Sequence, residues 1–248
     1  MVERVLKTQD DPDLGPHAPR AIKRPFMAQR WRDVSFLHWR CDAEAMQRLL
    51  PPGVEVDRWD GSAWVGVIPF HLSVRLPAWA PAIPWLQTTP EVNVRTYVRG
   101  PDGRRGIWFL SLEASRLAVV ATARAWYRIP YRWARTHVAV QDRTVTCETH
   151  RRSASFSATL EVGEQVDELS PLERFLICRW RLYSPGRGGR VWVSEIDHAP
   201  WRLRRARVTG CDESLVAPVP EGLPVAHHSP GVDVRWARRE RASTRAPA

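Results

Sequence analysis

The sequence predicts an α+β fold that is made mostly of antiparallel strands and forms one large domain. Short stretches of alternating apolar and polar residues recur along the 248-residue chain. Turn-forming pairs such as Asp60-Gly61 separate them, as in β-hairpins. Only three stretches have the composition and caps of helices. The chain is 44% apolar and contains 13 tryptophans, so it can build a sizeable core and is not disordered.

The pattern predicts about ten strands and three short helices. The strands are expected within residues 33–41, 54–74, 91–98, 107–114, 135–162, 190–197 and 231–236. The helices are expected at 42–50, 115–127 and 170–180. The third helix has the clearest start, because Ser170 can cap it, Pro171 suits its first position and Glu173 completes a capping box.

The strand EVNVRTYV, residues 91–98, has two different faces. Its valines and Thr96 alternate with Glu91, Asn93, Arg95 and Tyr97, so that the polar side chains form a row on one face. We predict that this row points into an enclosed cavity, with the valine face packed against outer helices or loops. The alternative is that Glu91 and Arg95 simply form a buried ion pair.

The ends of the chain are predicted to lie outside the domain. Residues 1–25 read as a flexible N-terminal arm, residues 26–237 as the single domain and residues 238–248 as a basic C-terminal tail. No apolar run approaches the ~20 residues that span a bilayer, and the first residues lack the apolar core of a signal peptide. We therefore expect a cytoplasmic protein without a membrane partner.

The four cysteines are scattered, which favours reduced thiols, buried or half-buried, over a disulfide framework. No histidine pair has metal-ligand spacing, and the adjacent His227 and His228 would point to opposite faces of a strand. No phosphate-binding or dinucleotide-binding glycine motif occurs. We expect no metal and no cofactor.

The net charge of +10 raises an alternative: a basic protein that binds nucleic acid or another partner through its own arginine clusters. The positive charge comes almost wholly from arginine, and its densest clusters lie at residues 201–208 and in the C-terminal tail. These clusters would have to share one face with exposed aromatic residues to form a nucleic-acid groove. Solvated arginine-rich faces are the favoured interpretation.

A series of motifs runs from about residue 30 to residue 236. They are, in order, WRDVSFLHWRCD, EVNVRTYV, FLSLEA, FLICRW, DHAPWRL and HSPGVDVRW. In sequence and order they resemble the YqjF-like family of bacterial proteins (domain of unknown function 2071). The resemblance implies the acetoacetate decarboxylase-like superfamily. The implied fold is a closed antiparallel barrel or double sheet around a central cavity, with a few helices outside it.

The same resemblance implies where a site would lie and which chemistry is missing. In the decarboxylases a glutamate matching Glu91 faces the cavity, and arginines matching Arg32 and Arg124 accompany it. Two adjacent lysines follow the proline that matches Pro130, and the first forms a Schiff base. Here Tyr131-Arg132 replaces them. Neither side chain can form an imine, so lysine-dependent decarboxylation is excluded.

We predict a small-molecule cavity for a carbonyl- or carboxylate-bearing ligand. Its expected lining is Arg32, His38, Glu91, Asn93, Arg95, Arg124 and Tyr131. If the protein is an enzyme, Glu91 would act as acid or base and Tyr131 would stabilise an oxyanion. Enzyme and non-catalytic binder remain open alternatives, as does a homo-oligomer.

Overall fold

The computed structural model describes residues 11–75, 88–116, 129–216 and 220–243. Within these residues one 14-stranded sheet curves back on itself, and two α-helices accompany it. The predicted α+β class with mostly antiparallel pairing is confirmed, with more strands than the ten or so expected. The described part of the chain contains no helix that is both long and apolar enough to cross a membrane.

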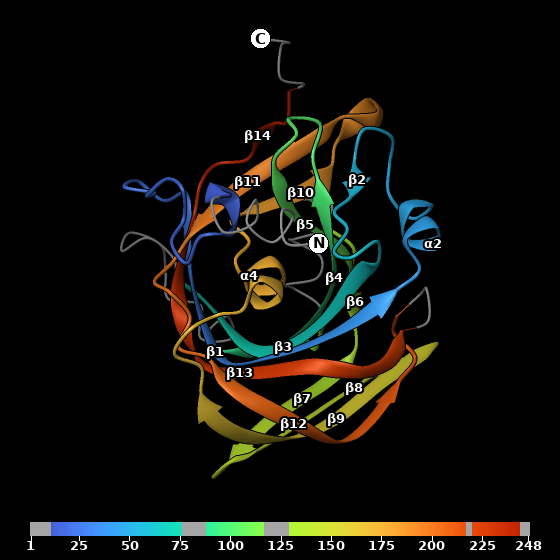
Figure 1. Ribbon diagram of the computed structural model, residues 1–248, viewed down its shortest axis with the longest axis vertical. Helices are drawn as coiled ribbons and strands as arrows, with labels where there is room; N and C mark the ends of the chain where they lie inside the picture. Colours follow the sequence, from blue (N-terminus) through green and yellow to red (C-terminus); the bar gives the residue numbers. More distant parts are fainter. Residues whose placement is uncertain (1–10, 76–87, 117–128, 217–219, 244–248) are drawn as a thin grey trace.

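Seven strands form a ring-like sheet in the order β11-β10-β5-β4-β3-β1-β13. They are β1 (Met27–Cys41), β3 (Ala63–Arg75), β4 (Thr89–Arg99), β5 (Arg105–Ala114), β10 (Arg181–Pro185), β11 (Val191–Asp197) and β13 (Glu221–Trp236). Neighbours are antiparallel except β5 and β10. Pairing of Ile196 and Asp197 with the end of β13 joins the two sides of the ring. Figure 1 shows the resulting ring face-on.

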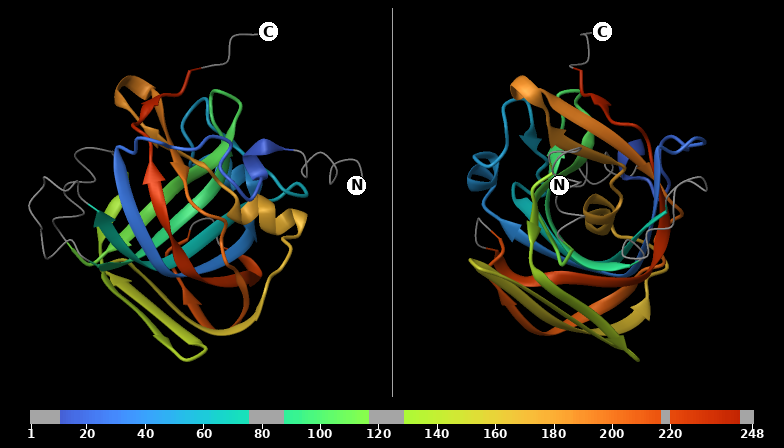
Figure 2. Two further views of the ribbon diagram at one scale, coloured as in Figure 1. Left: turned by 90° about the vertical axis from the view of Figure 1, so that its left-hand side faces the viewer. Right: turned by 180° about the vertical axis from the view of Figure 1, so that it is seen from behind.

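The other long strands form a second layer that continues from β13. They are β12 (Arg204–Glu213), β9 (Ala154–Gln165), β8 (Thr144–Arg151) and β7 (Arg135–Gln141). Strand β13 belongs to both layers, because it pairs with β1 along most of its length and with β12 near Ala226. Figure 2 shows this layer from the side, as the yellow-green and orange strands below the ring. Three short strands, β2 (Glu55–Val56), β6 (Tyr131–Trp133) and β14 (Glu240–Arg241), complete the sheet.

Strands of the ring that face the second layer are buried on both sides. On β1, Phe36 packs inside the ring, whereas Leu37 and Trp39 pack against the second layer. On β4, Val92 and Val94 also pack against the second layer. The expectation that this valine face would pack against helices or loops was therefore wrong: a sheet covers it, because β7, β8 and β9 present their own apolar alternation.

Local turn chemistry explains how the chain reverses and bends. Asp60 and Gly61 both have positive φ, 49° and 81°, as the predicted two-residue hairpin requires. Gly231 has a φ of 115° where β13 crosses β1, and a Cβ there would collide with the backbone of Trp31. Only glycine fits this crossing, which lets the ring bend sharply.

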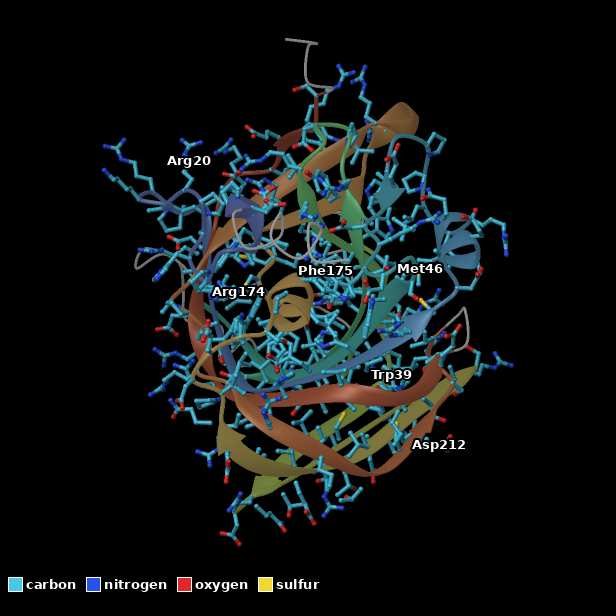
Figure 3. The ribbon with its side chains drawn as sticks, viewed as in Figure 1. Arg20, Trp39, Met46, Arg174, Phe175 and Asp212 are labelled. Carbon is cyan, nitrogen blue, oxygen red and sulfur yellow. The ribbon has the colours of Figure 1, made fainter. Side chains whose placement is uncertain are left out.

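Helix α4 (Pro171–Ile177) covers one end of the ring (Figures 1 and 2). The predicted capping box is present: Ser170 Oγ accepts from Glu173 N at 3.3 Å, and Ser170 N donates to Glu173 Oε2 at 2.7 Å. Phe175 is fully buried among the ring side chains, while Arg174 lies on another side of the helix (Figure 3). The other helix, α2 (Ala43–Gln47), lies at the periphery, and its Met46 packs near Trp39.

The helix predicted at 115–127 lies almost wholly outside the described residues. Two short 3₁₀ turns, η1 (Pro12–Leu14) and η3 (Arg187–Gly189), are described instead.

Both predicted chain ends need correction. Leu14 is buried, and Asp13 accepts a hydrogen bond from Arg181 Nη1 at 2.7 Å. The backbone N–H of Ile22 donates to Asp197 Oδ2 at 3.1 Å. Residues 11–25 therefore pack on the domain rather than forming a flexible arm. Beyond residue 237, β14 pairs with β11 and Ala242 is buried, so part of the predicted tail belongs to the sheet.

All four cysteines are unpaired. Cys41, Cys147 and Cys178 are buried, as expected, but Cys211 is exposed on β12. The exposure follows from the position of β12, whose outer face has no layer over it.

Candidate functional site

A small cavity lies inside the ring, with a volume of about 30 Å³. Its polar lining comes from Asn93 and Arg95 on β4, Arg179 after α4, Arg181 on β10, and His198 after β11. The rest is apolar and strongly aromatic: Trp31, Phe36, Phe70, Phe109, Trp201 and Trp236. Pockets for drug-sized ligands have roughly ten times this volume or more. Without side-chain movement, the cavity suits only a ligand of a few non-hydrogen atoms.

Arg95 is the main electrostatic feature of this cavity. It is only 9% exposed and makes no ion pair with any described residue. Its Nη2 donates to the Leu176 carbonyl at 3.3 Å, and its Nε has no hydrogen-bond partner among the described residues. The rings of Phe36 and Tyr97 lie 5.9 and 5.7 Å from the guanidinium carbon. Such contacts supply about 0.5–2 kcal/mol, less than the several kcal/mol that burying a charge costs.

The ion pair between Glu91 and Arg95, which was the alternative to the predicted cavity row, does not form; Glu91 is hydrogen-bonded to Tyr131 instead. The guanidinium of Arg95 therefore remains available for an anionic partner.

Asn93 adds a second unsatisfied polar group to the same wall. It is 9% exposed, and its Oδ1 is buried without a donor among the described residues. Buried amide oxygens are nearly always hydrogen-bonded in native proteins. Together, Asn93 and Arg95 give the cavity one unused acceptor and one unused cation on neighbouring positions of the same strand face.

Arg179 is held differently from Arg95. Its Nη1 donates to Asp57 Oδ2 at 2.8 Å, and its Nε donates to the Phe175 carbonyl at 2.7 Å. Asp57 also pairs with Arg105 and Arg99, so one carboxylate serves three guanidinium groups. Burial lowers the pKa of Arg179, and Asp57 partly offsets this effect. The surroundings of the cavity are therefore positively charged overall, which favours anions.

Glu91 and Tyr131 form a buried pair at one side of the ring. Tyr131 Oη donates to the two carboxylate oxygens of Glu91 at 3.2 and 3.3 Å. Burial raises the pKa of Glu91 to about 8, although the hydrogen bond from Tyr131 lowers it. Burial and the nearby carboxylate raise the pKa of Tyr131 well above its usual value. Glu91 is thus mostly protonated at neutral pH, as a general acid must be.

The structure brings some of the predicted site residues together and separates others. Asn93 and Arg95 line the cavity, whereas Glu91 and Tyr131 lie beyond Phe109, which contacts both the cavity and the cluster around Tyr131. The expectation that Glu91 itself lines the cavity is therefore not met. The two side chains contact each other.

The remaining predicted residues lie elsewhere. His38 is fully buried against Tyr97, with a ring-centroid separation of 5.9 Å, but does not line the cavity. The placement of Arg32 in the cavity was wrong. Its side chain is 41% exposed and pairs with Asp233 at 3.3 Å, because β1 bends there and turns the side chain outward. Arg124 lies outside the described residues.

Three cavity residues, Arg179, Arg181 and His198, were missed. Arg179 interrupts the apolar run at residues 175–180, and a charge within a buried apolar run signals a specific partner or role. His198 had no comparable signal, because its position depends on where the chain leaves β11. The described residues contain no group of three or more histidine, cysteine, aspartate or glutamate side chains that could hold a metal ion.

The basic cluster at residues 201–208 does not form an unpaired stripe. Arg205 pairs with Glu173 at 3.3 Å, Arg207 pairs with Glu161, and Arg204 Nε donates to the Gly163 carbonyl. Two of the four arginines in this cluster are therefore ion-paired.

Comparisons with known proteins agree with this architecture. The chain is 31% identical over 217 residues to the uncharacterized protein YqjF of Bacillus subtilis (strain 168), covering 84% of this chain and 89% of YqjF. Among solved structures, it resembles acetoacetate decarboxylase from Legionella pneumophila, with a TM-score of 0.65, 16% identity, and coverage of 91% and 92% of the two chains.

It also resembles the enduracididine biosynthesis enzyme MppR complexed with pyruvate, with a TM-score of 0.65, 14% identity, and coverage of 90% and 93%. These likenesses show an acetoacetate decarboxylase-like fold. Residues 28–233 match the model of the DUF2071 family, described as an uncharacterized conserved protein. The chain therefore belongs to the DUF2071 family.

Proposed function

We propose that this protein binds a small carboxylate- or carbonyl-bearing metabolite inside the ring, in the cytoplasm. The observation that carries the proposal is the guanidinium of Arg95, buried without a carboxylate among the described residues. A bound carboxylate would provide charge-assisted hydrogen bonds, which are about twice as strong as neutral ones. It would also offset the cost of burying the charge.

The size and chemistry of the cavity support the same class of ligand. A volume of about 30 Å³ excludes large cofactors, and even a molecule of a few carbons would need the lining side chains to move. Among proteins of this fold, MppR is complexed with pyruvate, a small molecule that bears both groups. That likeness is one of fold alone, so it supports the ligand class without identifying the ligand.

The Glu91–Tyr131 pair favours proton transfer as a second, catalytic role. Glu91 has a pKa near the working range of a general acid and base, and Tyr131 supplies a phenol beside it. The chemistry would proceed without a Schiff base, because the only lysines are Lys7 and Lys23. Lys23 is exposed, outside the ring.

The test is a panel of two- to four-carbon carboxylates and ketones, with binding measured by calorimetry and ligand-observed NMR. Wild-type protein should bind at least one carboxylate, and Arg95→Met should lose that binding while remaining folded. Arg32→Met is the matched control, because it removes the same charge from the partly exposed outer face. Equal loss in both variants, or carboxylate binding that survives in Arg95→Met, would reject the proposal.

A homo-oligomer stays a prediction, which light scattering of the purified protein would test.

A further inference from the structure

His198 presents one defined hydrogen-bonding group to the cavity. Its Nδ1 lies 2.7 Å from the Ala199 carbonyl oxygen. A carbonyl can only accept, so Nδ1 must carry the proton. In a neutral imidazole Nε2 is then an unprotonated acceptor, and it makes no hydrogen bond with the described residues. His198 thus brings a lone pair, rather than a donor, to the cavity wall that it lines.

The surroundings keep this imidazole neutral and fixed. It is 5% exposed and packs between Trp180 and Trp201, with ring-centroid distances of 4.6 and 4.9 Å. Burial lowers the pKa of His198 to about 4. The preceding Asp197 is locked by Arg235 Nη2 at 2.6 Å and by the N–H of Ile22. The ring therefore has little freedom to turn another atom toward a ligand.

The cavity consequently combines arginine side chains with two acceptors. Arg95 offers donors and positive charge, whereas Asn93 Oδ1 is buried without a donor among the described residues and His198 Nε2 is hydrogen-bonded to none of them. A simple carboxylate or a keto acid has no donor to offer either of them. Its oxygens would face the two acceptors with repulsion.

The hydrogen-bond donor that the ligand brings to these acceptors must be a neutral group rather than an ammonium group. No acidic side chain is among the described residues that line the cavity. The nearby Asp57 is already shared by three arginines. An ammonium group beside Arg95 and Arg179 would be repelled without compensation.

From these contacts we infer that the ligand is a small hydroxy acid. Its carboxylate binds Arg95, and its hydroxyl donates to His198 Nε2, with Asn93 Oδ1 as a second acceptor nearby. This inference rests on the proposed function and narrows it from carboxylates in general to those that carry a neutral hydroxyl beside the acid group.

The test compares matched three-carbon acids on the wild-type protein: lactate, propionate, pyruvate and alanine, with both enantiomers of the chiral acids. Glycolate against acetate repeats the comparison with two carbons. We expect a hydroxy acid to bind at least about tenfold more tightly than its unsubstituted, keto and amino counterparts, since a site with an unmet acceptor discriminates against ligands that lack the donor. Titration calorimetry or competition NMR measures the dissociation constants.

His198→Phe keeps a flat ring beside the two tryptophans but removes Nε2, and it should abolish the preference for a hydroxy acid over propionate. His150→Phe, the same change at an exposed position, should leave the preference intact. The wild-type comparison needs no variant, so it decides the question even if His198→Phe does not fold.

The outcomes separate the two proposals. Carboxylates that bind through Arg95 without a hydroxyl preference would overturn the hydroxy-acid inference alone, as would a preference that survives in His198→Phe. If no small carboxylate binds, both the proposed function and this inference fail.

Discussion

The two faces of strand β4 lie in contrasting surroundings. Val92 and Val94 face a dry interface between two sheet layers, packed against residues such as Phe156 and Leu160. Asn93 and Arg95 face the ring interior, where polar atoms lack partners. The first face follows the usual logic of a β-sandwich core. The second face retains groups that cost stability, which is expected where a protein keeps a functional site.

The largest expected effect on stability comes from a substitution that disrupts the packing on the apolar face. Phe156→Ala, at a fully buried position between the layers, should lower the free energy of unfolding by about 3–5 kcal/mol. Acid binding in the ring should persist as long as the protein is folded. Urea unfolding measures the loss. Val140→Ala, at a position that is 40% exposed, should change stability by under about 0.5 kcal/mol. Equal losses would contradict the assigned packing.

The next effect concerns the buried acid on the polar face. In the folded state the pKa of Glu91 is raised from 4.5 to about 8, so its ionisation opposes folding. The unfolded chain releases its proton first, and the wild-type protein should lose stability as pH rises from about 4.5 to about 8. Glu91→Gln removes this dependence and should be more stable than wild type near pH 9, by about 2–4 kcal/mol.

Unfolding measured from pH 5 to pH 9 checks this prediction, and the gain should shrink toward pH 5. The same change at the exposed Glu55 serves as the control and should give no such slope. A Glu91→Gln variant with the wild-type pH profile would show that Glu91 ionises normally.

A smaller effect is expected from Tyr131→Phe. The hydrogen bond from Tyr131 lowers the pKa of Glu91, so removing the hydroxyl should raise that pKa further. Stability at pH 7 should change by about 1 kcal/mol or less, because the Glu91 carboxyl is already mostly neutral. NMR titration of labelled glutamate carboxyl groups measures the shift. Ligand binding or turnover should weaken if the pair takes part in function. An unchanged Glu91 pKa would show that the Tyr131 hydroxyl does not hydrogen-bond to Glu91.

The last prediction is a negative result: no covalent adduct should form inside the ring. Borohydride reduction in the presence of acetoacetate or similar ketones should trap no adduct inside the ring, since Tyr131 and Arg132 cannot form an imine. Intact-mass and peptide mass spectrometry would detect one. Modification mapped to the ring would restore Schiff-base chemistry to consideration, whereas modification at the exposed Lys23 would not.

Features that depend on neighbouring residues were predictable from the sequence. The Asp60-Gly61 turn, the capping box at Ser170 and the alternating faces of β4 all follow from local stereochemistry. The placement of Tyr131 and Glu91 at a common site was expected only through the family resemblance.

Features that depend on long-range geometry were not predictable. Arg32 turns outward because β1 changes register with β3 after residue 32. His198 enters the cavity because Asp197 is fixed by residues 22 and 235, far away in the chain. No periodicity in the local sequence encodes such contacts. The cover over the valine face was likewise missed, because strand patterns do not reveal which layer lies over which face.

The closure of the ring by β13 has a consequence for how the chain folds during synthesis. Strand β1 pairs with β13, so β1, which is synthesised early, cannot complete its pairing until β13, the last long strand, has been synthesised. Such sequence-distant pairing slows folding, because a long loop must close before the contact forms. Until β13 leaves the ribosome, the edges of β1 and β11 lack their partner and can pair with other chains. We expect the nascent protein to depend on chaperones until that strand is in place.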